Sequence, residues 1–541
     1  MKKYLLVLVS LCCVLSAAFA ENPDYPELKK SDANIIGHVL DKKTKEHLPY
    51  ITVALKGTTI GTVTDATGHY FLKNLPEGSF VLEVSSVGYK TLTRNVTLKR
   101  GKTLEEDFEI EEDAIALDGV VVSANRSETT RRLAPTLVNV VDLKLFETTN
   151  SSTLSQGLNF QPGVRVETNC QNCGFQQVRI NGLDGPYTQI LIDSRPVFSA
   201  LSGVYGLEQI PASMIERVEV MRGGGSALFG SSAIAGTINI ITKEPLRNSG
   251  QLSHTITSVG GSSSFDNNTS LNASLVTDDH RAGLYIFGQN RHRSGYDYDG
   301  DGFTELPELK NQTVGFRSYL KTSTYSKLTF EYHHMQEFRR GGDMLDRPPH
   351  EAHIAEQLQH SIDGGSLKYD YFSPNEKNRL SIFASAANTD RDSYYGPGND
   401  PLKAYGKTTD LIAMGGAQYV HTFDKCLFMP SDLTAGLEYN RDRLKDNMWG
   451  YDRHTDQTVN IYSAFLQNEW KNERWSILVG GRLDKHNMVD NIIFSPRANL
   501  RFNPTQNINL RLSYSSGFRA PQAFDAVSYT HLRAHETLRH L

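Results

Sequence analysis

An alternation of apolar and polar residues with a period of two runs through the second half of the chain and limits the fold more than any other feature. In one segment Leu328, Phe330 and Tyr332 alternate with polar neighbours, and segments such as 433–440 repeat the pattern. Successive side chains of a β-strand point to opposite faces of the sheet, so each segment has one face suited to lipid and one suited to water. The pattern predicts a transmembrane antiparallel β-barrel over residues 250–525.

Short and long connections take turns between these segments. Short polar joints occur at 278–280 and 373–377, whereas long joints occur at 297–311 and 341–360. In outer-membrane barrels the short joints face the periplasm and the long ones face the outside, and the same placement is expected here.

The alternating segments number about thirteen. A barrel wide enough to enclose a globular domain has about twenty-two strands, and an unclosed sheet leaves edge groups without partners in lipid. The sequence therefore predicts an incomplete barrel. Residues 526–541 lose the alternation and are rich in His and Arg, which favours a non-native tail there.

The start of the chain has the pattern of an export signal. Two lysines, an apolar run and a small-residue end predict a secretory signal over residues 1–20, cleaved after Ala20. In an oxidising compartment Cys170 and Cys173 are expected to form a local disulfide, with redox or metal chemistry as the alternatives. The net charge of −5 gives no reason to expect a nucleic acid as partner.

Residues 34–112 contain short alternating strands separated by turns, the spacing of a β-sandwich. The stretch IIGHVLDKKTKEHLPYITVALKGTTIGTVTDATGHYFLKNLPEGSFVLEVSSVGYK closely resembles the carboxypeptidase regulatory-like domain, which is a non-catalytic appendage. A zinc peptidase needs ligands at fixed spacing and a carboxylate base, and this region offers His38, His47 and His69 without a paired Glu. The chain is not expected to be an enzyme.

A β-branched run, Val120, Val121 and Val122, follows an acidic link. Such a run is suited to adding a strand to the sheet edge of a partner protein, although an ordinary strand is the alternative. Residues 131–245 come next and contain VRINGLDGPYTQILIDSRPV and IPASMIERVEVMRGGGSALFGSSAIAGTINIITK. They resemble the plug domain of TonB-dependent outer-membrane receptors, and this position makes residues 116–125 resemble a TonB box. The predicted fold is thus mainly β: a sandwich, an α+β plug and an incomplete barrel.

Charged residues surround the glycine-rich turn of the plug. By the same resemblance, Glu216, Glu219 and Arg222 are expected to contribute to plug–barrel ion pairs, because a charge enclosed in a barrel needs a partner. Surface solvation is the alternative for the neighbouring Arg217. No Lys-Ser/Thr pair follows the glycines, which argues against a phosphate-binding loop.

The loop DYDGDGFTELPE fits the calcium-loop template. Asp297, Asp299 and Asp301 have ligand spacing, Gly302 stands at the turn, and Glu308 is the distal carboxylate. The prediction is a structural calcium ion on the rim of the barrel, with a solvated acidic loop as the alternative.

Histidines gather around the next long loop, among them His333, His334, His350 and His353. Imidazole suits haem or a soft metal, so these residues are weak candidates for ligand binding. Scattered polar surface is the alternative.

The resemblance implies active import across the outer membrane after Sec export. The implied cargo is a scarce ligand such as an iron-siderophore, haem, cobalamin or another metal chelate. The implied partners are the TonB–ExbB–ExbD complex and outer-membrane lipid, and no cofactor is required beyond the possible calcium. Two alternatives stay open: a SusC-like glycan importer, which also carries the sandwich, and a signal transducer, whose usual signalling domain has a different fold.

Overall fold

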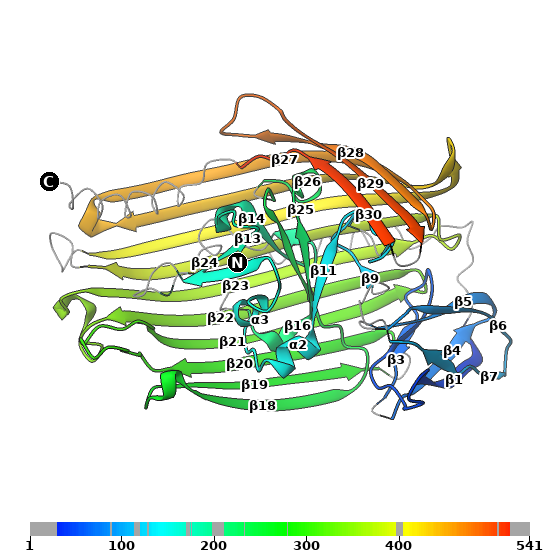
Figure 1. Cartoon of the computed structure of the whole chain (residues 1–541), viewed down its shortest axis with the longest axis horizontal. Helices are drawn as coiled ribbons and strands as arrows, with labels where there is room; N and C mark the ends of the chain where they lie inside the picture. Colours follow the sequence, from blue (N-terminus) through cyan, green and yellow to red (C-terminus); the bar gives the residue numbers. More distant parts are fainter. Residues whose placement is uncertain are drawn as a thin grey trace.

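The computed structural model describes residues 30–519, apart from residues 66, 87–88, 113–119, 127–128, 169–173, 175, 197–209, 232, 278–279, 397–403 and 506–507. The predicted signal, the predicted disulfide and the predicted tail lie outside the described residues. Figure 1 shows a small β-domain, a mixed central domain and a large curved sheet.

The first domain, blue in Figure 1, consists of two small sheets. One has the order β4-β1-β7, with β8 also paired to β1, and the other has the order β3-β2-β5-β6. The strands are β1 (Lys30–Asp41), β2 (Thr52–Leu55), β3 (Gly61–Val63), β4 (His69–Pro76), β5 (Gly78–Ser85), β6 (Leu92–Leu98), β7 (Thr103–Glu105) and β8 (Phe108–Ile110). Alternate residues, including Ile35, Val53, Leu72, Leu82 and Phe108, form the buried core. The predicted β-sandwich is confirmed.

The central domain contains a five-stranded sheet with the order β11-β16-β17-β14-β15. The domain as a whole contains β9 (Val120–Val121), β10 (Thr129–Thr130), β11 (Val138–Asp142), α2 (Leu143–Thr148), α3 (Leu154–Leu158), β12 (Val164–Thr168), β13 (Gln176–Ile180), β14 (Thr188–Ile192), β15 (Arg195–Pro196), β16 (Ile215–Arg222), α5 (Ser226–Phe229) and β17 (Gly236–Thr242). The Asp142 carboxylate caps α2 by accepting a hydrogen bond from the Leu145 amide at 2.9 Å. Tyr285 and Phe287 of the large sheet complete the core of this domain, so the two parts pack as one body.

The large sheet has thirteen strands, each antiparallel to the next along the chain. They are β18 (Ser249–Ser258), β19 (Phe265–Val276), β20 (Ala282–Arg293), β21 (Glu308–Ser323), β22 (Ser326–Gly342), β23 (Ala355–Phe372), β24 (Asn378–Tyr395), β25 (Tyr405–Cys426), β26 (Met429–Met448), β27 (Arg453–Lys471), β28 (Trp475–His486), β29 (Ile493–Thr505) and β30 (Ile508–Ser515). Within the described residues β18 and β30 do not pair with each other, and the sheet stays open. The predicted incomplete barrel and its number of strands are confirmed.

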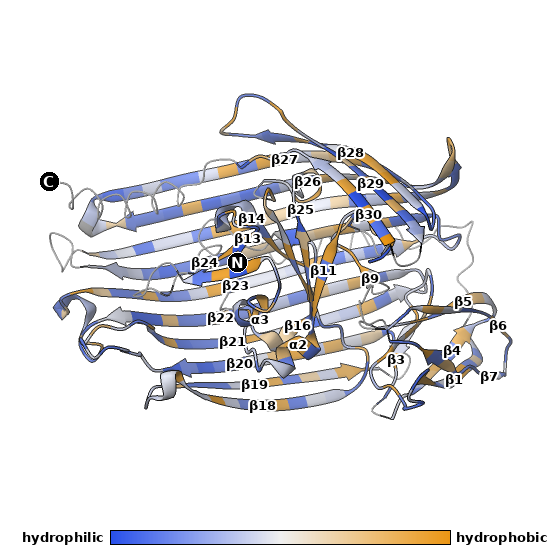
Figure 2. Cartoon of the chain, viewed as in Figure 1, coloured by the Kyte–Doolittle hydropathy of each residue, from blue (hydrophilic) through white to orange (hydrophobic). Residues whose placement is uncertain are grey.

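The two faces of this sheet are reversed relative to those of a soluble protein. In β26, Leu437 is 66% exposed whereas the next residue, Glu438, is 6% exposed. Arg339 and Arg501 are likewise buried on the inner side, and apolar and polar residues alternate along the strands in Figure 2. A sheet with exposed leucines and buried charges is built for lipid outside and for polar contacts inside.

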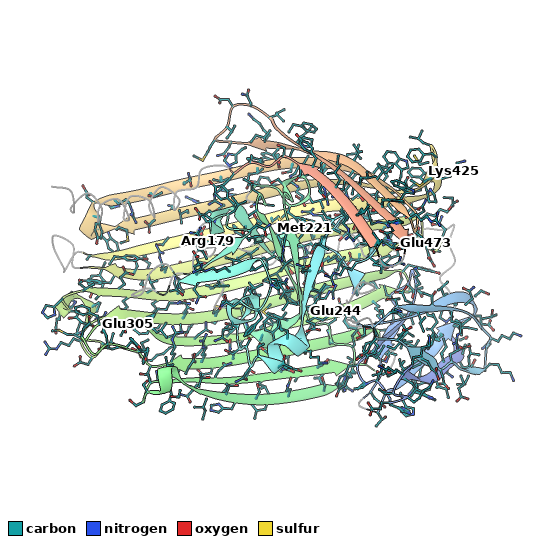
Figure 3. All side chains as sticks on the ribbon, in the orientation of Figure 1. Arg179, Met221, Glu244, Glu305, Lys425 and Glu473 are labelled. Atoms are coloured by element: carbon teal, nitrogen blue, oxygen red, sulfur yellow. The ribbon has the colours of Figure 1, made fainter. Side chains whose placement is uncertain are left out.

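The sandwich lies at the end of the sheet that carries the short connections. The amide of Thr59 donates to the carbonyl of Thr324, in the short turn between β21 and β22, at 3.0 Å. Figure 3 places Lys425, near the end of β25, and Glu473, in the short turn between β27 and β28, at this end and Glu305 at the opposite end.

Among the helices in the described part of the chain, none is long and apolar enough to cross a membrane.

Candidate functional site

The β-branched run predicted for coupling lies against the central domain, which is the predicted plug. Residues 120–126, which contain this run, are called the coupling segment below. β9 pairs antiparallel with β10, so that Val121 lies opposite Thr129. The Val121 side chain is fully buried against a cluster that includes Leu191, Met221 and Phe229. The segment is therefore held by apolar packing as well as by main-chain pairing.

Glu219 fixes the residues that follow this strand. One carboxylate oxygen accepts hydrogen bonds from the amides of Val122 and Ser123, both at 2.9 Å, and from the Ser123 hydroxyl at 2.7 Å. Its other oxygen lies 3.0 Å from Nε of Arg217, and Asn239 donates to the Ser123 hydroxyl at 3.0 Å. The Glu219 side chain is completely buried, so these donors replace the water that the charge has lost.

The sequence prediction gave Glu216, Glu219 and Arg222 a plug–barrel role. Glu216 forms its described ion pair with Arg217, and Arg222 donates to the carbonyl of Pro162. With Glu219 bound to the coupling segment, the described hydrogen bonds and ion pairs of all three join plug residues or the strand docked on them. Their plug–barrel role stays a prediction.

Other residues connect the coupling segment to the large thirteen-stranded sheet, which is called the wall below. The Arg126 guanidinium pairs with Glu438 of β26, and both side chains are at most 5% exposed. Glu438 also accepts from Arg482 of β28 at 2.7 Å, so one wall carboxylate neutralises two buried cations. Asn125 donates to Glu469 of β27 at 2.9 Å. The plug is thus anchored to the wall immediately after the coupling strand, a role that no motif in the sequence had marked.

A second group joins the opposite side of the plug to β21 and β22. Arg317 pairs with Asp193 of the plug and lies 3.4 Å from Glu244, in the link between plug and barrel. Lys327 contacts the same Glu244 carboxylate at 3.0 Å. Figure 3 shows Glu244 where the plug meets the wall.

A cavity of about 260 Å³ opens between the plug and the wall, near the end with the long connections. The plug side includes Gln156 and Asn159, and the wall side includes Asp266, Arg291 and Arg293. Arg291 pairs with Asp266 at 2.6 Å, so part of its charge is already compensated. Arg291 and Arg293 lie two residues apart in β20 and therefore on the same face. The alternation in the sequence predicted that this face points inward, but it did not show which inward residues line a cavity.

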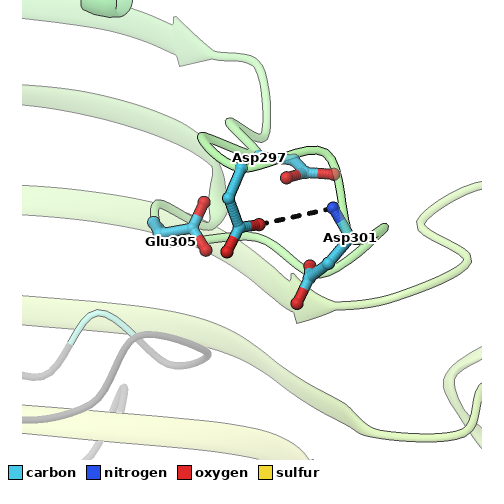
Figure 4. A group of neighbouring side chains, drawn as sticks. Asp297, Asp301 and Glu305 are labelled. Carbon is cyan, nitrogen blue, oxygen red and sulfur yellow. Dashed lines mark hydrogen bonds between the residues drawn. The ribbon is translucent and has the colours of Figure 1, made fainter.

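The acidic loop brings four carboxylates together. Oxygen atoms of Asp297, Asp299, Asp301 and Glu305 all lie within 4.8 Å of one another. Figure 4 shows Asp297, Asp301 and Glu305 gathered in this loop. Three of the predicted ligands therefore meet, and Glu305 stands where the sequence prediction had placed Glu308.

Glu308 is directed elsewhere because it begins strand β21. Its carboxylate lies 2.8 Å from Lys310, two residues along the same face of the strand. Calcium in this loop stays a prediction, with Glu305 as the fourth carboxylate.

The four candidate histidines are not brought together. His333 and His334 are successive residues of β22 and point to opposite faces; His334 lies 3.0 Å from Asp363. The ring of His350 bonds to the hydroxyl of Tyr405 at 2.8 Å, and that of His353 bonds to Asp343 at 2.6 Å, so each ring has a different environment. Within the described residues they form no common ligand set, and their ligand role stays a prediction.

Comparison with known proteins agrees with this architecture. Residues 35–122 match the CarboxypepD_reg-like domain, residues 130–237 match the TonB-dependent Receptor Plug Domain, and residues 237–537 match the TonB dependent receptor-like β-barrel. The last match covers more than half of the chain.

The chain belongs to the TonB-dependent receptor family.

Similar receptors include the vitamin B12 transporter BtuB of Vibrio vulnificus strain CMCP6, which is 25% identical over 437 residues, 78% of this chain and 66% of the relative. The BtuB of strain YJ016 is 29% identical over 237 residues, 39% of each protein. Among solved structures, the siderophore receptor PirA of Acinetobacter baumannii has a TM-score of 0.62 at 19% identity, over 72% of this chain and 62% of that one. A mutant of the ferric enterobactin receptor PfeA of Pseudomonas aeruginosa has a TM-score of 0.60 at 19% identity, over 72% of this chain and 63% of that one. This chain spans just under two thirds of the length of the first of these relatives and of both solved receptors.

Replacement of Glu219 should release the coupling segment. Glu219→Ala removes the acceptor of three hydrogen bonds and the partner of Arg217, which costs about 3 kcal/mol locally. Hydrogen exchange of the Val122 and Ser123 amides, followed by mass spectrometry, should accelerate about 100-fold. Glu216→Ala is the matched control, since that side chain is 45% exposed and its described hydrogen bond and ion pair are with Arg217 rather than with the segment. Unchanged exchange in Glu219→Ala would show that the carboxylate does not hold the strand.

The contact of Glu244 should depend on pH. Lys327 beside it holds the pKa of the Glu244 carboxyl well below its usual range. A depressed carboxyl pKa gives stability that is complete above the unfolded-state pKa of about 4.3 and declines as the pH falls toward the folded value. Glu244→Gln should lower the free energy of unfolding at pH 7, and its difference from wild type should shrink between pH 5 and pH 3 in urea titrations. Glu473→Gln, in an exposed turn, is the control; a Glu244→Gln difference that stays constant with pH would contradict the pairing.

Calcium binding should separate Glu305 from Glu308. Glu305→Gln should weaken calcium binding roughly tenfold or more, because it removes one charged ligand from the loop. Glu308→Gln should bind calcium as wild type does, since Glu308 faces Lys310. Titration calorimetry with CaCl₂ measures both variants, and equal affinities for the two would refute the assignment of Glu305.

Proposed function

We propose that this chain belongs to an outer-membrane importer that takes up a scarce metal chelate, most simply cobalamin or an iron-siderophore, with energy from TonB. The observation that carries the proposal is a β-branched strand docked on a plug that packs against the inner face of a sheet with an apolar exterior. This arrangement offers a detachable strand on the side of the plug where a periplasmic partner would pull. The relatives named as vitamin B12 transporters and siderophore receptors support a chelate as cargo.

In this proposal the ligand enters from the end with the long connections and occupies the cavity between plug and wall. Polar plug residues such as Gln156 and Asn159 contact it from the plug side of the cavity. On the wall side, Arg291 and Arg293 favour anionic groups such as phosphate or carboxylate. The ligand thereby contacts both the movable domain and the fixed wall.

The coupling step acts through Val120, Val121 and Val122. Once released from the plug, this run offers main-chain donors and acceptors for pairing with a sheet edge of TonB. The TonB–ExbB–ExbD complex would supply the force, outer-membrane lipid would cover the apolar face, and the chain would act by transport without enzymatic catalysis. No nucleic acid takes part.

The sandwich favours one second candidate, a SusC-like glycan importer, because such importers also carry this domain at the N-terminus. The cargo would then be an oligosaccharide, whereas the coupling step would be unchanged.

A proline in the coupling strand should separate binding from transport. Val121→Pro removes a main-chain donor from the strand that TonB must grip, so energised uptake should fall at least about tenfold while binding at the cell surface persists. The receptor with its complete barrel is expressed in a strain that lacks other receptors for the ligand, and uptake of radiolabelled cobalamin and of a ⁵⁵Fe-siderophore is measured. Val121→Ile is the conservative control.

Two outcomes would count against this proposal. Full uptake by Val121→Pro would exclude the strand as the coupling element. Uptake of a labelled oligosaccharide with no uptake of either chelate would favour the glycan importer.

A further inference from the structure

Three histidines from different segments meet on the surface of the sandwich, away from the plug and the cavity. His38 lies in β1 and His69 in β4, and the two residues are opposite each other in the antiparallel pair. His47 reaches them from the connection after β1, where a bridge to Leu40 holds it in place. Gly68, with φ of +79°, permits the close approach, because a Cβ there would lie 2.8 Å from the Cβ of His47.

The three rings are close enough for side-chain rotation to bring their nitrogens to one ion. Their centroids are 5.1 Å apart for His38 and His47, 5.6 Å for His38 and His69, and 5.0 Å for His47 and His69. Rings that bind one tetrahedral ion through nitrogen atoms at about 2.0–2.1 Å have centroids roughly 5 Å apart.

Each ring is also oriented by a hydrogen bond through the same nitrogen. Nδ1 of His38 lies 3.1 Å from Asp107, Nδ1 of His47 lies 2.8 Å from the carbonyl of Thr67, and Nδ1 of His69 lies 3.0 Å from the Thr67 hydroxyl. Asp65 in turn accepts from the amide and the hydroxyl of Thr67. Acceptors on the second nitrogen are what metal-binding histidines need, because they fix the tautomer and make the other nitrogen more basic. In all three residues Nε2 takes no part in these bonds.

We propose that His38, His47 and His69 bind one transition-metal ion, Zn²⁺ or Cu²⁺, through their Nε2 atoms, with water in the remaining position. Neutral imidazoles prefer these ions to Mg²⁺ or Ca²⁺. Among the described residues the ring nitrogens of these three histidines do not all lie within 4.8 Å of one another, so binding requires the side chains of His47 and His69 to rotate toward His38. His47 and His69 are exposed and have room to rotate.

The ion would connect β1, the connection that follows it, and β4. It would act as a structural or metal-sensing site, because the three ligands include no carboxylate placed as a general base. This part of the sandwich belongs to the domain that contacts the short turns of the barrel through Thr59. Metal binding would therefore stiffen the domain that lies beside the exit of the barrel.

The test compares metal content in the full chain, purified in detergent, treated with EDTA and then equilibrated with ZnCl₂. The double variant His47→Gln and His69→Gln should bind one Zn²⁺ fewer per chain than wild type, measured by elemental mass spectrometry. Cobalt gives a second measurement: Co²⁺-loaded wild type should show the absorption of a tetrahedral ion, and the double variant should lose that absorption.

The matched control is His254→Gln with His454→Gln, which removes two exposed histidines outside the cluster and should leave both readouts unchanged. Both replaced ligands in the test variant are exposed, so its circular dichroism spectrum should match that of wild type. Equal zinc content and the same Co²⁺ spectrum in wild type and the test variant would overturn the proposal. The result is independent of uptake, so it does not depend on the proposed cargo.

Discussion

The burial of charge inside an apolar wall is the constraint on which the rest of the structure depends. Lipid offers no hydrogen bonds, so the strands turn their charged residues inward, where each charge needs a partner. The plug supplies part of that partnership: Arg126 pairs with Glu438, and Asp193 pairs with Arg317. Wall and plug are therefore interdependent, because removal of either leaves buried charges of the other without compensation.

The same constraint explains how the coupling strand is held. Val121 contributes apolar burial, whereas Glu219 contributes a buried carboxylate that accepts hydrogen bonds from the amides of Val122 and Ser123. Detachment exposes this carboxylate and Arg217 to water, which solvates both, so the penalty of opening is moderate compared with that of a dry cavity. A strand held in this way is stable at rest and still removable.

Much of the architecture was predictable from the sequence because it depends on local periodicity. The alternation around Leu437 and Glu438 follows from strand geometry, and the number of strands followed from counting such segments. The site was less predictable, since it depends on which strand lies opposite which loop. Glu219 has the sequence context of a plug–barrel residue, but in the fold its side chain faces the segment at Val122.

The acidic loop shows the same limit at shorter range. The linear template selected Glu308 by its spacing, yet that residue had already entered β21, and Glu305 remained in the loop. Template spacing assumes a helix after the loop, whereas a strand advances about twice as far per residue. The cluster of His38, His47 and His69 was visible in the sequence only as three scattered residues, because the register of β1 and β4 brings them together.

The order of contacts along the docked segment determines how it responds to tension. A pull applied ahead of Val120 reaches the strand pairing first, next the two amides on Glu219, and then Asn125 and Arg126 on the wall. These contacts therefore follow one another along the chain in the order in which such a pull would reach them. The last contacts in the series belong to the wall, so a sustained pull on the segment would pass from the strand to the contacts between plug and barrel.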